Sequence, residues 1–249
     1  DYWKYSGIER DVYLYARPQS RVRDFRMTAE LVNDYKDGEL NLDVLLHQPK
    51  VGETVEVKVL DKGKEIYNRK KSITSITDTL FSQQEIFPNI RAWNAETPNT
   101  YTLVVSTFDA QGKPLESFTH LFGFRTVEMR NGMQMINGKA VLFKGVNRHE
   151  HDPHKGRTIS VASMIHDIQL MKQFNLNGVR NCHYPNYSAW YELCTEFGLY
   201  MVDEANIESH GSGGKLSNDP EWAVPFLERV SRMVVRDRNH PSIVMWSLG

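Results

Sequence analysis

Residues 141–249 alternate between apolar strand-like segments and amphipathic helix-like segments, and this order restricts the fold more than any other feature. The predicted strands cover residues 141–147, 177–182, 199–205 and 242–249. The predicted helices cover residues 161–174, 188–197 (capped by Ser188 and ended by Gly198) and 219–234. Short connections in this order require a parallel sheet with right-handed crossovers. The pattern predicts the first half of a (β/α)8 TIM barrel. A doubly wound sheet fits less well, because no glycine-rich phosphate turn follows the first strand.

The first half of the sequence instead contains short strand-like segments separated by turn residues. Period-two alternation or β-branched runs occur at residues 26–34, 39–48, 54–61, 99–109 and 116–129. This spacing predicts an antiparallel immunoglobulin-like β-sandwich without the antibody disulfide. Asn137-Gly138 between apolar arms predicts a hairpin. We therefore expect a multidomain β and α/β protein, with a sandwich over residues 18–127 and a half barrel over residues 128–249.

The charge balance of the chain gives no reason to expect nucleic acid or a membrane as partner. Lys and Arg total 30 against 31 Asp and Glu, so the formal net charge is −1. No apolar run approaches the ~20 residues that a membrane span needs. Cys182 and Cys194 lie in apolar contexts without metal-ligand spacing, and we expect buried free thiols. Such thiols fit a reducing compartment, which favours the cytoplasm. A periplasmic location stays open, because the sequence begins inside a patterned segment.

Polar clusters follow three predicted strands, at residues 147–154, 183–186 and 203–210. In a barrel these strand ends share the face that carries the chemistry. We expect His149 and His183 to contact substrate there, with Trp246 bordering the pocket. Alternatives remain open: a zinc site at His149 and His151, a surface loop, or a core role for His183.

The third cluster contains carboxylate and imidazole groups that suit a divalent cation. Glu208 and His210 favour Mg²⁺ or Mn²⁺ over Zn²⁺, and at least one further ligand must come from elsewhere. Asp203 and Glu204 are adjacent on a strand and face opposite sides. They are therefore a poor catalytic pair for one glycosidic bond, which needs carboxyl groups ~5–5.5 Å apart for a retaining reaction.

Four segments of the chain resemble the β-galactosidases of glycoside hydrolase family 2: GVNRHEHDPHKG, MKQFNLNGVRNCHYPN, YMVDEANIESHG and RDRNHPSIVMWSLG. The opening WKYSGIERDVYLYARP is similar to the end of that family's sugar-binding jelly roll, so residues 1–17 are assigned to it. The resemblance implies transition-state stabilisation by His149 and His183. It also implies magnesium binding by Glu208 and His210, and binding of galactose and sodium by Asp1. Asn206 and Trp246 are expected to contact substrate.

The resemblance implies a retaining hydrolysis of terminal β-D-galactosides such as lactose by the intact protein, an expected homo-oligomer. In the family, WSLG is followed by Asn-Glu, which supplies the acid/base, and the nucleophilic Glu lies further on. The sequence ends at Gly249, so we expect this chain to be inactive alone. The open strand edges of a half barrel also predict marginal stability or self-association. The alternatives are a β-glucuronidase-like relative, whose substrate carboxylate only Arg148 or Arg180 could pair with, and a non-catalytic carbohydrate-binding module.

Overall fold

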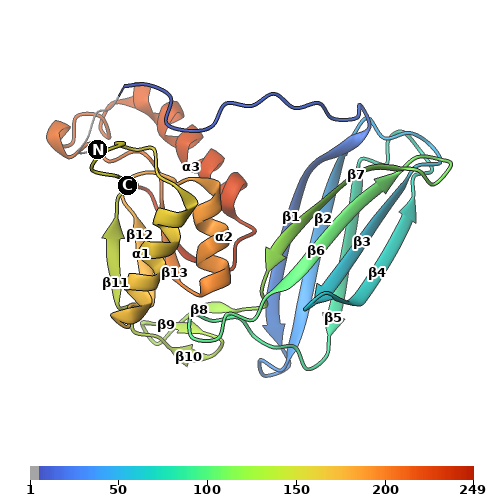
Figure 1. The fold of residues 1–249 in the computed structure, drawn as a ribbon, viewed down its shortest axis with the longest axis horizontal. Helices are drawn as coiled ribbons and strands as arrows, with labels where there is room; N and C mark the ends of the chain where they lie inside the picture. The colour runs from blue at the N-terminus through green and yellow to red at the C-terminus, as the bar shows by residue number, and fades with distance from the viewer. Residues whose placement is uncertain (1–5) are drawn as a thin grey trace. The chain divides into compact units, whose positions relative to one another are not determined.

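The computed structural model describes residues 6–249, and within them the chain divides into two compact units (Figure 1). The β unit consists of residues 13–93 and 97–140. The α/β unit consists of residues 6–12, 94–96 and 141–249. Two short segments that are distant in sequence therefore belong with the second unit. Asp1, the expected galactose and sodium ligand, lies outside the described residues.

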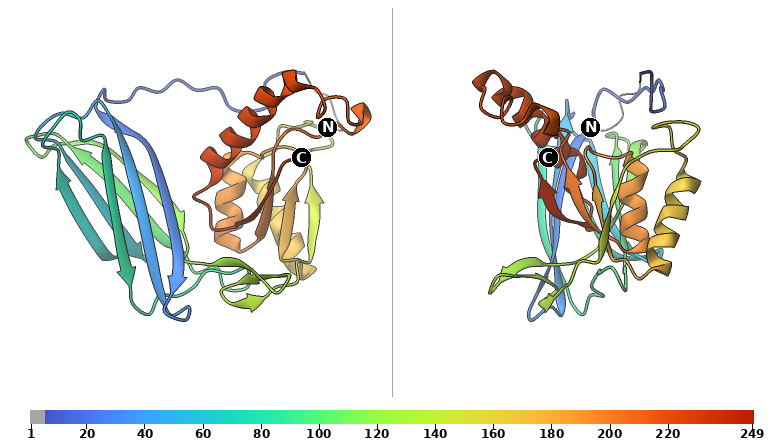
Figure 2. Two further views of the ribbon diagram at one scale, coloured as in Figure 1. Left: turned by 180° about the vertical axis from the view of Figure 1, so that it is seen from behind. Right: turned by 90° about the vertical axis from the view of Figure 1, so that its left-hand side faces the viewer.

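The β unit is an immunoglobulin-like sandwich, as predicted (Figures 1 and 2). One antiparallel sheet has the order β1-β2-β5 and the other has the order β4-β3-β6-β7. The strands are β1 (Arg21–Val32), β2 (Asp37–His47), β3 (Thr54–Asp61), β4 (Lys64–Ser72), β5 (Leu80–Phe87), β6 (Tyr101–Phe108) and β7 (Pro114–Phe122). Alternate residues of β2 and β3, such as Leu40, Val44 and Val57, are completely buried. Burial of each such side chain stabilises the fold by about 1.5–3 kcal/mol, which holds the two sheets face to face.

Two strands of the sandwich were absent from the expected set. β4 is exposed along almost its whole length and rich in lysine, so it carries no alternating apolar pattern. It is an edge strand, and its charges are a common protection against further strand pairing. β5 is also an edge strand, and it buries only Phe81 and Phe87. Sequence periodicity detects half-buried strands and is weak for edges of this kind.

A small antiparallel sheet follows the sandwich and confirms the predicted hairpin. Its order is β10-β9-β8, from β8 (Val127–Arg130), β9 (Met133–Ile136) and β10 (Lys139–Ala140). The turn between β9 and β10 is Asn137-Gly138, with φ of 52° and 73°. Positive φ at both positions is what a two-residue type I′ turn requires, and Asn-Gly adopts it with little strain.

The α/β unit has four parallel strands in chain order, the arrangement of the first half of a TIM barrel. They are β11 (Gly145–Arg148), β12 (Gly178–Asn181), β13 (Tyr200–Glu204) and β14 (Ile243–Ser247). The helices are α1 (Val161–Gln173), α2 (Ser188–Phe197) and α3 (Ala223–Asp237), with 3-10 turns η1 (His210–Ser212) and η2 (Pro220–Trp222). α1 and α2 pack against the sheet through a core that includes Ile168, Trp190 and Met201. No helix of the described chain is long and apolar enough to cross a membrane.

Three local predictions for this unit need correction. β11 begins at Gly145 rather than at residue 141, because Asn177 binds the preceding backbone through Leu142 O (3.0 Å) and Lys144 N (2.8 Å). Ser188 is the first residue of α2 and not its cap. The Tyr187 N–H at this helix start is instead bound by the Glu150 carboxylate at 2.9 Å. Gly198 ends α2 in the left-handed conformation, as expected.

The last helix also differs from its predicted apolar face. Asp219 caps η2 by accepting a hydrogen bond from Glu221 N, and α3 proper begins only at Ala223. Leu227 is 67% exposed, and α3 fully buries only Met233 and Asp237. The apolar periodicity therefore predicted the helix correctly, but it did not predict which residues the helix buries in this chain.

Candidate active site

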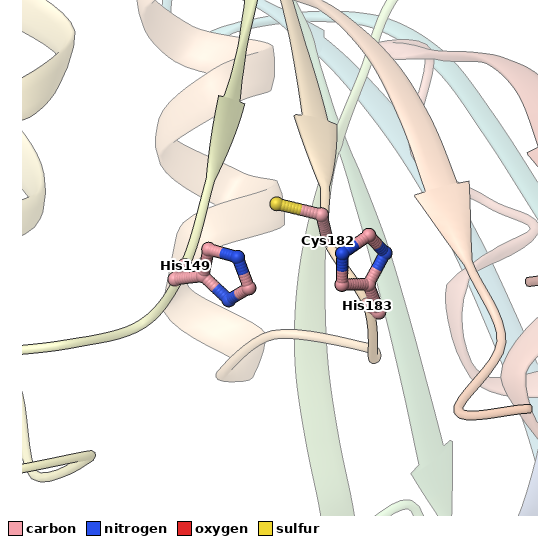
Figure 3. A group of neighbouring side chains, drawn as sticks. All are labelled: His149, Cys182 and His183. Atoms are coloured by element: carbon pink, nitrogen blue, oxygen red, sulfur yellow. The ribbon is translucent and has the colours of Figure 1, made fainter. Parts of the chain in front are cut away.

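Three side chains that follow the ends of β11 and β12 meet at the carboxyl edge of the parallel sheet (Figure 3). The His149 and His183 rings are 5.4 Å apart between centroids and nearly perpendicular, at 73°. Cys182 is buried beside them, with its sulfur directed toward His149. One donor atom from each of the three residues lies within 4.8 Å of the others. His151, which would join His149 in the alternative zinc site, is not part of this group.

Glu204, the last residue of β13, holds His183 in place. Its Oε1 is 2.7 Å from His183 Nδ1, and its side chain is completely buried. Arg180 donates two hydrogen bonds to the same carboxylate, from Nε at 2.6 Å and from Nη2 at 2.9 Å. Ser247 Oγ at the end of β14 donates to Oε2 at 2.7 Å. One buried carboxylate thus connects residues that follow or end three neighbouring strands.

The electrostatics of the cluster keep Glu204 ionised and His149 neutral. Burial alone would raise the pKa of Glu204, but hydrogen bonds from Ser247, Arg180 and His183 lower it below the ordinary value. Burial lowers the pKa of His149, and the neighbouring side chains of His183, His151 and Arg180 lower it further. The site therefore presents an uncharged imidazole beside a second imidazole that is oriented by an ionised carboxylate.

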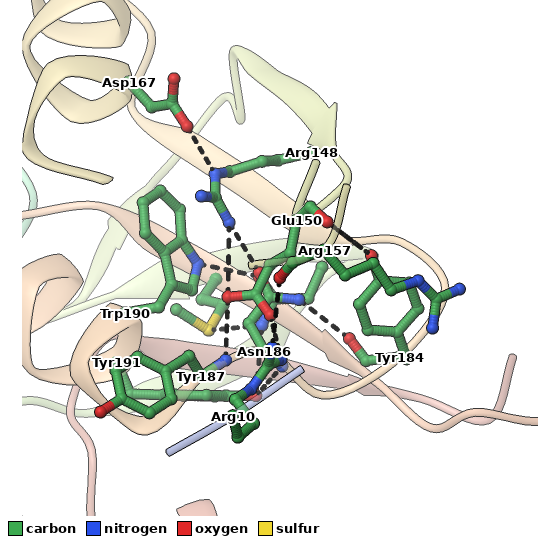
Figure 4. Close-up of polar contacts among 12 residues, drawn as sticks. Arg10, Arg148, Glu150, Arg157, Asp167, Tyr184, Asn186, Tyr187, Trp190 and Tyr191 are labelled. Carbon is green, nitrogen blue, oxygen red and sulfur yellow. Dashed lines mark hydrogen bonds and ion pairs between the residues drawn. The ribbon is translucent and has the colours of Figure 1, made fainter. Parts of the chain in front are cut away.

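A second buried network fixes the loop that carries His149 (Figure 4). The Arg148 guanidinium lies 3.8 Å from the centre of the Trp190 ring, and it donates to Asp167 and to Asn186 at 2.9 Å each. Glu150, with no exposed surface, is paired with Arg10. Arg148 and Glu150, the two sequence neighbours of His149, thus hold the backbone of this loop in position.

Glu208 and His210 lie together in the loop after β13. His210 N donates to Glu208 Oε1 at 3.0 Å. The loop lines a cavity of about 420 Å³ whose wall also includes Gly249. An ideal Cβ on Gly249 would lie 3.1 Å from Glu208 N, so β14 leads directly to this loop. Within residues 6–249, no third His, Cys, Asp or Glu joins the pair as a metal-binding group.

The remaining predicted substrate contacts occupy the same edge of the sheet. Asn206 is exposed in the loop that follows β13. Trp246 is 41% exposed on β14, where it is the register partner of Asp203. The roles of both residues in substrate binding stay predictions.

Comparison with known proteins identifies the family. The family description "Glycosyl hydrolases family 2, TIM barrel domain" matches residues 127–249, and "Glycosyl hydrolases family 2" matches residues 20–125. A β-galactosidase of Photobacterium profundum is 43% identical over the whole chain, and one of Priestia megaterium is 44% identical. The chain belongs to glycosyl hydrolase family 2. It spans 25% and 26% of the length of these two relatives.

Solved structures of β-glucuronidases share the fold. A β-glucuronidase of Bifidobacterium dentium complexed with coumarin-3-O-glucuronide is 26% identical, with a TM-score of 0.80 over 93% of this chain and 38% of that one. A β-glucuronidase of Ruminococcus gnavus in complex with D-glucuronic acid is also 26% identical, with a TM-score of 0.78 and coverage of 93% and 37%.

Arg148 and Arg180, the two arginines that could pair with a glucuronate carboxylate, already have side-chain partners in this chain. Arg148 is 6% exposed and stacked on Trp190. Arg180 makes its two-donor contact with Glu204. A substrate carboxylate at Arg180 would compete with the buried Glu204 for the same donors, and one at Arg148 would compete with the partly exposed Asp167.

Sequence reasoning missed the part that Glu204 plays in the site. It correctly placed Asp203 and Glu204 on opposite faces: Asp203 accepts from Tyr191 at 2.7 Å, whereas Glu204 faces Arg180 and His183. The available signal was the position of a carboxylate at the last residue of a barrel strand beside an arginine at the equivalent end of the preceding strand. Cys182 is a buried free thiol, as predicted, but it also lies close to both histidines.

Proposed function

We propose that the intact protein containing this chain hydrolyses terminal β-D-galactosides with retention of configuration. The observation that carries the proposal is the His149–His183 pair at the carboxyl edge of the half barrel, oriented by Glu204. The names of the relatives support the galactoside class, and the engagement of Arg148 and Arg180 disfavours the glucuronide class.

The two histidines bind and orient the sugar in this proposal. Because Nδ1 of His183 faces Glu204, Nε2 is left to contact a sugar hydroxyl. His149, uncharged and partly buried, provides a second polar contact from the neighbouring strand end. Hydrogen bonds of this kind accelerate the reaction to the extent that they strengthen as positive charge develops on the ring.

Glu208 and His210 would hold a magnesium ion beside the sugar site. A carboxylate oxygen and an imidazole nitrogen suit Mg²⁺ or Mn²⁺, and the loop abuts the end of β14, from which a further ligand can reach it. The ion would supply positive charge that stabilises developing negative charge nearby. A sodium site at Asp1 is the second ionic contact that we propose.

The acid/base and the nucleophile would come from outside this chain. Glu204 is buried and bound by Arg180, His183 and Ser247, so it has no free lone pair directed at a substrate. Asp203 is buried on the other face of β13. We therefore propose that the 249-residue chain alone is inactive. We also propose, as the resemblance implies, that the intact β-galactosidase is a homo-oligomer.

Hydrolysis of 4-nitrophenyl β-D-galactoside by the intact protein tests the proposal, with the matching glucuronide as second substrate. We expect turnover of the galactoside only, and a loss of about 100-fold or more in kcat/KM for His183→Ala and for His149→Ala. His166→Ala, an exposed histidine on α1, is the control and should retain full activity. Preference for the glucuronide would refute the substrate class, and full activity of the His183→Ala variant would refute the site.

A further inference from the structure

We infer that His149, Cys182 and His183 form a binding site for a soft divalent transition metal of the Zn²⁺ and Cd²⁺ class. This site is separate from the Glu208–His210 pair and uses different donor chemistry. Its existence depends on these three side chains and on the Glu204 carboxylate behind His183, whereas competition with a sugar, argued below, rests on the proposed function.

The geometry of the three side chains is close to that of a metal site. Their donor atoms lie within 4.8 Å of one another. A tetrahedral zinc ion with Zn–S near 2.3 Å and Zn–N near 2.0–2.1 Å holds one sulfur and two nitrogen donors roughly 3.3–3.6 Å apart. The donors that are farthest apart therefore need to approach by up to about 1.5 Å. Side-chain torsions of His149, which lies in the loop just beyond the end of β11, can provide that change while Glu204 keeps His183 in place (Figure 3).

The surroundings of His183 supply the second requirement of a metal site. Metal-binding histidines commonly donate their other ring nitrogen to a carboxylate, which fixes the ring and makes the ligand more basic. The Nδ1 atom of His183 lies 2.7 Å from Glu204 Oε1, and Glu204 is in turn held by Arg180 and Ser247. Nε2 of His183 is then the metal-binding atom.

The donor set selects the metal. One sulfur and two imidazole nitrogens favour Zn²⁺, Cd²⁺ or Co²⁺ over Mg²⁺, which prefers oxygen ligands. Three protein ligands leave a fourth position for water or another oxygen donor. Because His149 and His183 are also the proposed sugar contacts, a bound metal would compete with the sugar and inhibit the intact enzyme.

The matched cysteine variants of the 249-residue chain separate this site from adventitious thiol binding. Cys182 and Cys194 are both buried and free, but only Cys182 lies with the two histidines. Titration with Cd²⁺ should give the near-ultraviolet thiolate-to-metal absorption with one ion per chain. We expect the same signal for Cys194→Ser and its loss for Cys182→Ser. His149→Ala and His183→Ala should each weaken the affinity at least tenfold, with circular dichroism checking that every variant is folded.

Several outcomes would overturn the inference. They are absence of the absorption in the wild-type chain, its persistence in Cys182→Ser, or equal loss in both cysteine variants, which would indicate binding to unfolded chain. Inhibition of the intact enzyme is a separate measurement. If the chain binds Cd²⁺ through Cys182 but the intact protein shows no galactosidase activity, the metal site stands and the proposed function is refuted.

Discussion

His183 Nδ1 and Glu204 Oε1 are 2.7 Å apart at the ends of adjacent parallel strands, and this contact determines the orientation of the imidazole. Glu204 can do this because it is both buried and ionised: Arg180 and Ser247 supply hydrogen bonds that offset the cost of burial. The role of His183 in the proposed reaction thus depends on a residue that need not touch the substrate.

Glu204→Gln in the intact protein should lower kcat/KM by about 10–100-fold, because hydrogen bonds to charged groups contribute ~1.5–3 kcal/mol. The amide keeps the shape but cannot bind Arg180 and His183 as a charged acceptor. The pH profile of kcat/KM should also change, since His183 loses its anionic partner, whereas a purely structural role would leave that profile unmoved. Ser247→Ala removes one neutral donor to the same carboxylate and should cost less than tenfold. Equal effects of the two substitutions would contradict the positioning role.

Arg148→Lys should destabilise the α/β unit by about 1–3 kcal/mol. Lysine keeps the charge, but it cannot stack its head group on Trp190 while donating to both Asp167 and Asn186. The matched control is Arg232→Lys, which alters an exposed ion pair with Glu228 on α3 and should change stability by less than 0.5 kcal/mol by the usual scale for surface pairs. Urea unfolding measures both variants. A loss in Arg148→Lys no larger than in the control would show that the stacked geometry contributes little.

The sequence was sufficient to predict the immunoglobulin-like sandwich and the half barrel, because both depend on clear apolar periodicities in the chain. The buried alternation of β2 and the left-handed Gly198 at the end of α2 are examples. The exposed β4 and the partly open face of α3 could not be predicted, since neither depends on a strong apolar pattern. His149 and His183 were found from their places after strands. The interactions of Glu204 could not be predicted from periodicity, because a hydrogen-bond network between three strand ends leaves no periodic pattern.

The stability of the α/β unit should fall as pH rises from about 5 to 8 because of Asp203. Burial and the nearby Asp237 carboxylate raise the pKa of Asp203 from 3.8 to about 7, although Tyr191 and Asn181 donate to it and Arg236 lies close by, paired with Asp237. Its folded pKa exceeds the unfolded value, so the native state binds the extra proton between these pH values. The stabilisation is complete below about pH 4 and is lost as pH rises through about 7.

Asp203→Asn tests this pH dependence, because an amide cannot ionise. Hydrogen-exchange protection of the β12 and β13 amides reports local stability, and wild type and variant are compared at the same pH so that intrinsic exchange rates cancel. Relative to the variant, the wild type should lose about 2–3 kcal/mol between pH 5 and 8. A constant difference between the two proteins across this range would mean that Asp203 does not titrate there.

Removal of divalent cations from the intact protein should lower its galactosidase activity, and Mg²⁺ or Mn²⁺ should restore it. Glu208 and His210 are the proposed ligands, held together by the 3.0 Å contact between His210 N and Glu208 Oε1. Glu208→Ala should raise the Mg²⁺ concentration needed for half-maximal activity by at least tenfold, because one of few protein ligands is lost. Glu221→Ala, on the same long connection after β13, is the control and should leave that concentration unchanged. If activity survives chelation, magnesium has no part in the mechanism. If chelation abolishes activity but Glu208→Ala needs no more Mg²⁺ than the wild type, the ion is bound by other ligands.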